Sequence, residues 1–211
     1  MWGANLIYCE LCGFKGSKYL PNKSIPFTDV ANDTWYYPYV LTAYEFGILD
    51  GKTKTTFDPD AGMTLAEAAK IAACIFEHLA ATGADFTAAP GESWYQPYVD
   101  FCYEYSILED YITFQWEKPA TRAQMAYLFS RADFNPDGAY YVNPDVPLTD
   151  IPDVYDTTPF AYEILELYRR GIAVGGEHMA FYPNSGVKRS EAAAFISRIL
   201  CYDMRIELPR G

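Results

Sequence analysis

The chain has 211 residues, half of them hydrophobic, and a formal net charge of −12. It contains no run of about 18 to 20 apolar residues, so the sequence predicts no membrane span. Binding to nucleic-acid phosphates requires clustered Lys and Arg, and the acidic balance therefore argues against a nucleic-acid partner. The 19 Tyr and four Trp are unusual, because such rings form flat binding platforms as well as cores.

Residues 1–26 form an N-terminal leader that the pattern in the rest of the chain does not explain. They lack a basic segment followed by a long apolar run, so they do not resemble a signal peptide. Cys9 and Cys12 have zinc-knuckle spacing, but a structural zinc site needs two more ligands at a matching spacing. A local disulfide or two free thiols are the alternatives. The other cysteines lie on predicted helices and are expected to be buried free thiols: Cys74, Cys102 and Cys201.

The stretch from Phe57 to Leu79 predicts a turn followed by a helix. Asp, Pro and Gly residues form the turn. Thr64 and Glu67 have capping-box spacing, in which each side chain bonds an orphan amide of the first helical turn. Apolar residues then recur at helical spacing and give one hydrophobic face: Ala68, Ile71, Ala72, Ile75, Phe76 and Leu79.

This pattern recurs, and the recurrence indicates a tandem array of three copies. An offset of 124 carries four residues of the first copy onto identical residues of the third: Phe57, Pro59, Gly62 and Glu67 onto Phe181, Pro183, Gly186 and Glu191. An offset of 59 carries four onto the second: Trp35, Tyr36, Pro38 and Tyr39 onto Trp94, Tyr95, Pro97 and Tyr98. The boundaries are repeat 1 at 27–83, repeat 2 with linkers at 84–147, repeat 3 at 148–203 and a tail at 204–211.

Each copy is predicted to contain two helices. The first helices are expected at Tyr36–Phe46, Tyr95–Tyr105 and Thr158–Arg170, and the second at Thr64–Thr82, Thr121–Ala132 and Lys188–Tyr202. Gly47 and Gly171 stand where a helix end requires a positive φ, which costs glycine least. Ser106 has the matching place in copy two and predicts a weaker cap. A short β-hairpin within each Phe-x-Pro loop is an alternative.

These motifs resemble the S-layer homology repeat over about residues 27 to 201. In copy one the motifs are Phe27-Thr28-Asp29-Val30, Trp35, Gly47-Ile48, Phe57-Asp58-Pro59 and Thr64-Leu65-Ala66-Glu67. Copy three echoes the opening as Leu148-Thr149-Asp150-Ile151. The second helices of copies two and three begin with Thr121-Arg122-Ala123-Gln124 and Lys188-Arg189-Ser190-Glu191.

The resemblance implies an all-α fold, in which three tandem helix–loop–helix repeats form a pseudo-threefold trimer with a central three-helix bundle and three lobes. It also implies a non-covalent anchoring module at the cell wall of an exported protein. Such modules bind secondary cell-wall polysaccharide, often pyruvylated, in grooves between repeats. The sequence has no HExxH, GxSxG or phosphate-loop motif, and we expect no enzymatic activity, cofactor or metal.

The motif positions define an expected ligand-binding set. An arginine there would bind a carboxylate through its planar fork, and Trp rings would stack on sugars. The set is Arg122, Arg189, Lys188, Trp35, Trp94, Asp29, Asp150, Glu67, Glu191, Gly51 and Gly175. Leu65 replaces the arginine in copy one, so its groove is expected to be silent or altered, and Pro159 replaces the Trp in copy three.

Simpler interpretations compete with this set. Lys188 and Arg189 also fit a solvated helix start, and Trp35 and Trp94 also fit packing anchors. The alternative function is a structural or assembly protein, in which degenerate repeats bind other surface proteins through a Tyr-rich surface.

Overall fold

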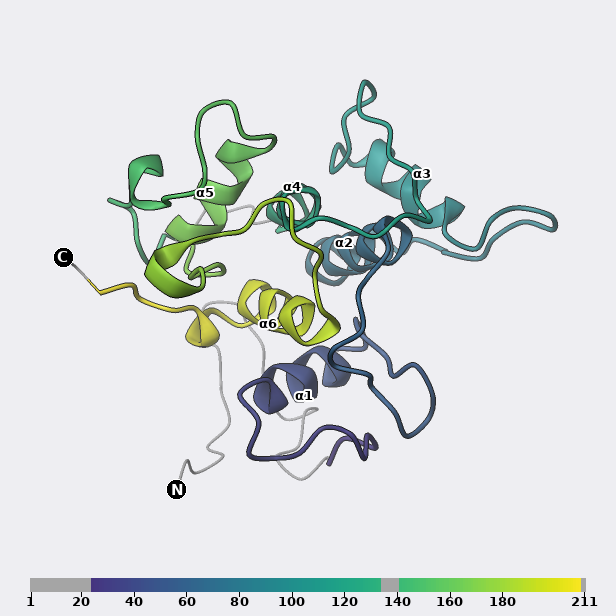
Figure 1. The fold of residues 1–211 in the computed structure, drawn as a ribbon. Helices are drawn as coiled ribbons and strands as arrows, with labels where there is room; N and C mark the ends of the chain where they lie inside the picture. The colour runs from purple at the N-terminus through teal and green to yellow at the C-terminus, as the bar shows by residue number, and fades with distance from the viewer. Residues whose placement is uncertain (1–23, 134–140, 210–211) are drawn as a thin grey trace. The chain divides into compact units, whose positions relative to one another are not determined.

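The computed structural model describes residues 24–133 and 141–209. Within these ranges the secondary structure comprises six α-helices, three short 3₁₀-helices and no β-strand (Figure 1). The mainly helical class is therefore confirmed for this part of the chain, and no hairpin forms in its loops. The elements are α1 (Tyr37–Glu45), α2 (Leu65–Ala80), α3 (Gln96–Glu104), α4 (Arg122–Ala132), η1 (Leu148–Asp150), α5 (Ala161–Arg169), η2 (Glu177–Met179), α6 (Arg189–Leu200) and η3 (Tyr202–Met204).

The chain divides into two compact units. Unit 1 lies within Met1–Ala61 and Arg189–Arg205, and its described part contains α1, α6 and η3. Unit 2 lies within Gly62–Lys188 and Ile206–Gly211, and its described part contains α2, α3, α4, α5, η1 and η2. Unit 1 thus combines the first helix of copy one with the second helix of copy three.

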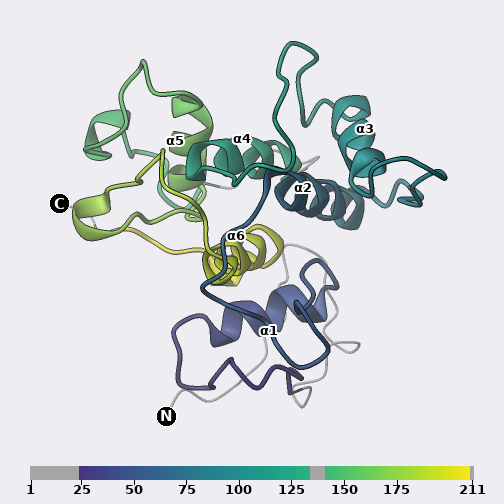
Figure 2. The same cartoon turned by 45° about the vertical axis from the view of Figure 1, so that its right-hand side comes forward.

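In unit 2 the helix α4 lies between α2 and α5, and α3 packs against α2 (Figures 1 and 2). The apolar faces supply these contacts. Ile71 and Ile75 on α2, and Leu128 and Phe129 on α4, are at most 2% exposed. Complete burial of one such side chain stabilises the fold by about 1.5–3 kcal/mol, so these faces hold the unit together.

In unit 1 the helix α1 packs against α6. Val40 and Ala43 on α1 are fully buried, and so is Ile196 on α6. The Ser197 hydroxyl donates a hydrogen bond to the Tyr39 carbonyl oxygen at 2.9 Å and joins the two helices. A helix of copy one is therefore held by a helix of copy three, although the copies are at opposite ends of the repeated region.

The predicted core positions on the second helices are all buried: Ala68, Ile71, Ala72, Ile75, Leu128, Phe129, Phe195, Ile196 and Ile199. Burial of a position does not show which other helices cover it. A single core around a threefold axis remains a prediction.

The predicted capping box at the start of α2 is confirmed. The Thr64 hydroxyl accepts the Glu67 N–H at 3.2 Å, and the Glu67 carboxylate accepts the Thr64 N–H at 2.8 Å. Thr121 and Gln124 form the same reciprocal pair at the start of α4, at 3.2 and 2.9 Å. Each pair satisfies two backbone donors that a helix start leaves without an intrahelical partner.

The first helices also end as the sequence predicts. The second residue after each helix end has a positive φ, at 69° for Gly47, 56° for Ser106 and 72° for Gly171. This left-handed conformation costs a residue with a Cβ roughly 1–2 kcal/mol. The positive φ therefore costs more free energy at Ser106 than at Gly47 or Gly171. A weaker helix end in copy two is expected for this reason.

The start of α5 is three residues later than predicted. The Thr158 hydroxyl accepts the Tyr155 N–H at 2.9 Å, and the Thr158 N–H donates to the Tyr155 carbonyl at 2.8 Å. These bonds close a turn around Thr158. Phe160 then adopts a positive φ of 62°, so the helix begins only at Ala161.

Candidate functional site

The second helix of each copy begins against a loop of another copy. The first two amides of the helix donate to two loop carbonyls, and these bonds satisfy orphan donors of the helix start. All six bonds are between 2.8 and 3.0 Å long. At the start of α2, the Leu65 and Ala66 amides donate to the Lys118 and Trp116 carbonyls; at the start of α4, the Arg122 and Ala123 amides donate to those of Ser185 and Pro183. At the start of α6, the Arg189 and Ser190 amides donate to the Ala61 and Pro59 carbonyls. We name these contacts the Leu65, Arg122 and Arg189 junctions; each lies within one unit.

At the Arg189 junction, in unit 1, the Arg189 side chain binds Phe57. Its guanidinium carbon lies 4.7 Å from the centre of the Phe57 ring, and its Nε donates to the Phe57 carbonyl at 2.9 Å. Its Nη2 donates to the Asp50 carbonyl. Arg189 is only 4% exposed, so its guanidinium is largely shielded from water. Its hydrogen bonds hold both ends of the segment from Asp50 to Phe57.

Asp29 holds the same loop from its other side. Its carboxylate accepts the Phe57 N–H at 2.9 Å and the Asp58 N–H at 2.7 Å. Partial burial raises the pKa of the Asp29 carboxyl, but these hydrogen bonds, with a smaller contribution from the Arg189 charge, lower the pKa below its ordinary value overall. Asp29 therefore stays ionised and fixed at neutral pH.

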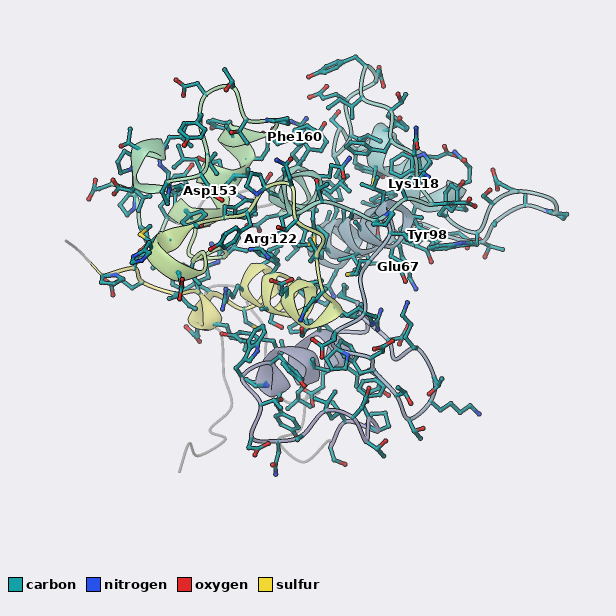
Figure 3. The ribbon with its side chains drawn as sticks, in the orientation of Figure 1. Glu67, Tyr98, Lys118, Arg122, Asp153 and Phe160 are labelled. Atoms are coloured by element: carbon teal, nitrogen blue, oxygen red, sulfur yellow. The ribbon has the colours of Figure 1, made fainter. Side chains whose placement is uncertain are left out.

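The Arg122 junction, in unit 2, repeats this arrangement; Figure 3 labels Arg122 and Asp153. The Arg122 guanidinium lies 4.9 Å from the centre of the Phe181 ring, and its Nε donates to the Phe181 carbonyl at 2.7 Å. Asp153 accepts the Phe181 N–H at 2.7 Å and the Tyr182 N–H at 2.6 Å. Arg122 is half-buried, so this residue is more exposed than Arg189.

Asp153, and not Asp150, is the counterpart of Asp29. It lies 124 positions after Asp29, the offset that relates copies one and three. The repeat pattern matched Thr28-Asp29 with Thr149-Asp150, so it did not identify Asp153, which accepts the loop N–H bonds in copy three. Asp150 instead ends η1, where it lines a surface pocket together with Asn143 and Leu208.

The loop backbone is strained at the same position in both junctions. Asp58 has a φ of 61° and Tyr182 a φ of 59°, values that residues with a Cβ adopt at a cost. The N–H of each is one of the two that the aspartate accepts. The paired hydrogen bonds offset this strain and keep the loop in one conformation.

The Leu65 junction keeps the backbone bonds but replaces the side chains. Leu65 stands in the arginine position and is 2% exposed. Trp116 stands where the other loops have Pro59 and Pro183, and it is half-buried, whereas both prolines are buried. Trp116 was not among the predicted site residues, although a Trp in place of two prolines was visible in the sequence.

The predicted aromatic residues lie on the surface. Trp35 is 58% and Trp94 52% exposed. Trp35 meets the Tyr36 and Tyr39 rings at centroid distances of 5.5 and 6.2 Å, and Trp94 meets its equivalent tyrosines at 5.6 and 6.4 Å. The same three-ring cluster is thus built twice, and more than half of each indole surface remains exposed to solvent.

Trp35 is separated from the Arg189 junction along α6. Its partner Tyr39 accepts a hydrogen bond from Arg198 Nη2 at 3.0 Å. Arg198 is nine residues beyond Arg189, which corresponds to about 13 Å along a helix. That Trp35 and Trp94 are walls of the ligand grooves stays a prediction.

Three residues of the predicted ligand set have structural roles in the fold: Glu67, Gly51 and Gly175. Glu67 completes the capping box of α2. A Cβ on Gly51 would lie 2.4 Å from the Phe27 ring, and one on Gly175 would lie 2.6 Å from the Tyr168 hydroxyl, so neither position accepts a side chain.

The remaining charged members of the predicted set lie around the start of α6. Glu191 is in the first turn of α6 and is half-buried. Lys188 is exposed. It is the last residue of the Gly62–Lys188 segment of unit 2.

No group of three His, Cys, Asp or Glu side chains within residues 24–133 and 141–209 is arranged to hold a metal ion. Cys102 and Cys201 are buried as expected, whereas Cys74 is only half-buried, so that expectation was wrong for Cys74. None of the three forms a disulfide in the described ranges, and burial raises the pKa of Cys102 to about 12. Cys9 and Cys12 lie outside the described residues, as does most of the N-terminal leader. No helix within the described residues is long and apolar enough to cross a membrane.

Comparison with known proteins bears on the same segments. The S-layer homology domain family matches residues 26–69 and 150–193. The chain is similar to the Surface-layer 125 kDa protein of Lysinibacillus sphaericus, with 31% identity over 54% of this chain and 10% of that protein. It is also similar to an Endoglucanase of Bacillus sp. (strain KSM-635), with 24% identity over 85% of this chain and 19% of that protein. The chain thus spans about a fifth or less of the length of these two relatives.

The matched segments contain the components of the Arg189 junction and part of the Arg122 junction. Asp29, Phe57 and Arg189 all lie within them, as do Asp153 and Phe181. The middle copy lies between the two matched segments, and a third repeat there stays a prediction, which the recurring caps and junctions favour.

Proposed function

We propose that this chain is a non-covalent anchoring module that holds an anionic polysaccharide of the bacterial cell wall. The observation that carries the proposal is the Arg122 junction. There a half-buried guanidinium is fixed by the Phe181 ring and the Phe181 carbonyl, beside a loop that Asp153 holds in place. A guanidinium held in one orientation favours bidentate binding of a carboxylate, such as the acidic group of a pyruvylated sugar.

The overall charge of the chain makes this local arrangement necessary. A net charge of −12 repels an anionic polymer at long range. At physiological ionic strength that repulsion is screened beyond about 8 Å. A fixed cation in a partly dry site is screened much less, so a few such contacts outweigh the background.

The two arginines are proposed to act differently. Arg122 would contact the ligand carboxylate directly, because it is half-buried rather than buried. Arg189 would mainly position the loop from Asp50 to Phe57, because it is 4% exposed and bonds carbonyls at both ends of that loop. Lys188, next to Arg189 in the sequence, would add positive charge.

Sugar rings are proposed to stack on Trp35 and Trp94. Both indoles are more than half exposed, and two tyrosine rings support each of them. Since the Trp35 cluster is distant from the Arg189 guanidinium along α6, the polymer would make these contacts with different residues of its chain. Contact at several such points raises the overall affinity without any single strong site.

The test is calorimetric titration with a purified pyruvylated disaccharide. Arg122→Ala should weaken binding by on the order of 1.5 to 3 kcal/mol, the range for hydrogen bonds to charged groups. Arg122→Lys keeps the charge but loses the planar fork, so it should recover only part of the affinity. Leu65→Ala is the control and should leave the affinity nearly unchanged. Equal affinities for Arg122→Ala and the parent would refute the carboxylate contact.

Protein–protein assembly is the alternative function, and the exposed tyrosines favour it. Tyr111 is 83%, Tyr162 67% and Tyr155 64% exposed. Retention on wall polymer supports the anchor, whereas concentration-dependent assembly in size-exclusion chromatography without retention supports a scaffold. The similarity to an endoglucanase covers 19% of that protein, and we propose no catalytic step for this chain.

A further inference from the structure

The Leu65 junction has the backbone geometry of the other two junctions but a different surface chemistry. The Leu65 and Ala66 amides bond the Lys118 and Trp116 carbonyls at 2.9 and 2.8 Å, as the equivalent amides do elsewhere. No arginine stands at the helix start, and the residue there is a buried leucine. The loop is therefore positioned like an anion-binding loop although the anion-binding side chain is absent.

Trp116 is held at this junction from two directions. Its carbonyl is fixed by Ala66, and its ring lies 5.6 Å from the Phe114 ring at an interplanar angle of 89°. Phe114 in turn contacts the Tyr127 and Phe160 rings, each at 6.4 Å. This support gives the indole a fixed orientation, which reduces the entropy that ligand binding would cost.

The charge around Trp116 favours an uncharged ligand. Between Phe114 and Lys118 the exposed charged side chains are one acidic and one basic, Glu117 and Lys118, whose charges cancel (Figure 3 labels Lys118). Gln115 is exposed beside them. An aromatic ring whose neighbours in the sequence carry an amide, a carboxylate and an ammonium group suits a sugar ring, which presents C–H groups on its face and hydroxyls at its rim.

We propose that Trp116 is the centre of a binding subsite for uncharged sugar residues of the polysaccharide. This inference rests on the proposed function and assigns a ligand class to the junction that lacks the arginine. The polymer would then be bound through an acidic residue at the Arg122 junction and through a neutral residue at the Leu65 junction. Loss of the arginine in copy one changes the ligand of that junction instead of abolishing binding there.

The experiment uses the full chain labelled with 5-fluorotryptophan and followed by fluorine NMR. Four Trp give four resonances, and Trp116→Phe removes and thereby assigns one of them. The probes are a purified pyruvylated wall polymer and the same polymer after mild acid has removed its ketals. We expect the Trp116 resonance to shift with both polymers, because the uncharged residues are present in both.

Affinity measurements separate this subsite from the arginine site. Trp116→Ala should lower the affinity for ketal-free polymer about tenfold, while Tyr111→Ala, which removes an exposed aromatic ring outside the proposed subsite, serves as the matched control. Trp116→Phe keeps a ring against Phe114 and tests binding if the alanine variant unfolds. Arg122→Ala should leave the shift of the Trp116 resonance with ketal-free polymer intact.

The outcomes distinguish this inference from the proposed function. If the native polymer binds but neither polymer moves the Trp116 resonance, the subsite is refuted and the anchoring function stands. If only the native polymer moves it, the junction responds to the anionic residue and the neutral-sugar assignment is wrong. If the native polymer does not bind at all, the proposed function fails and this inference fails with it.

Discussion

Arg189 stacks on the ring of Phe57, a residue 132 positions earlier, and donates its Nε–H to the carbonyl of the same residue at 2.9 Å. Asp29 accepts the N–H of Phe57. Both backbone groups of one phenylalanine are therefore bound by oppositely charged side chains. Arg122, Phe181 and Asp153 repeat the relationship. Such an arginine stabilises the fold, and under the proposed function Arg122 would also contact the ligand, so the two contributions are to be measured separately.

The first prediction concerns stability. Arg189→Ala removes a ring contact and leaves two loop carbonyls without this donor, so it should cost about 1–3 kcal/mol. Arg122→Ala should cost less, because Arg122 is half-buried and water can replace its bonds. Urea denaturation of both variants provides the measurement. Equal destabilisation would show that burial does not distinguish the two arginines.

The second prediction concerns pH. Asp29 has a lowered pKa in the folded chain because Phe57 and Asp58 donate hydrogen bonds to it. A lowered pKa contributes stability above the unfolded-state pKa, and that contribution is lost as the pH falls through the folded-state value. Asp29→Asn should therefore be less stable than the parent at neutral pH, and the difference should shrink below about pH 4. Melting temperatures across this pH range provide the test, and a difference that does not change with pH would contradict it.

Much of the local structure could be predicted because it depends on neighbouring residues. The Thr64 capping box and the positive φ at Gly47 follow from residue types a few positions apart, and both are present. Asp153 could also have been found by keeping the constant offset between copies. The start of α5 was placed too early because the Thr158 side chain favours a local turn over a helix start.

The junctions could not be predicted from the repeats. A repeated sequence identifies which residues are equivalent, but not which copy contacts which. Nothing in the sequence states that Arg189 of copy three meets Phe57 of copy one. The burial of Arg189 follows from that contact, so its structural role was also hidden. Trp116 was overlooked because the family pattern directed attention to the residues that are retained.

The third prediction compares two helix starts. Thr64→Ala should destabilise the chain by about 1 kcal/mol, because it removes the acceptor of the Glu67 N–H. Lys188 holds the equivalent position before α6 and has no hydroxyl, so Lys188→Ala should cost nothing by this route. Thermal unfolding of the two variants provides the comparison. Equal shifts would mean that capping does not account for the role of Thr64.

The fourth prediction concerns the expected common core. Ile199 is 4% exposed on α6, and Ile199→Ala should cost roughly 2 to 5 kcal/mol. If the second helices share one core, hydrogen exchange should accelerate in α2 and α4 as well as in α1 and α6. Acceleration confined to α1 and α6 would argue against the threefold arrangement.

The last prediction restores the arginine that copy one lacks. In the other junctions the residue at the helix start places a guanidinium over the loop phenylalanine, at 4.7 and 4.9 Å. The Leu65 amide has the same backbone bond as the Arg122 and Arg189 amides, so Leu65→Arg should direct its side chain toward Phe114. We expect higher affinity for the pyruvylated disaccharide, measured by calorimetry, together with some loss of stability because a buried leucine is removed. Leu65→Met is the matched control, since it keeps an apolar side chain of similar volume and adds no charge. If Leu65→Arg folds and binds the disaccharide no better than Leu65→Met, a cation at the helix start is not sufficient to bind the anion.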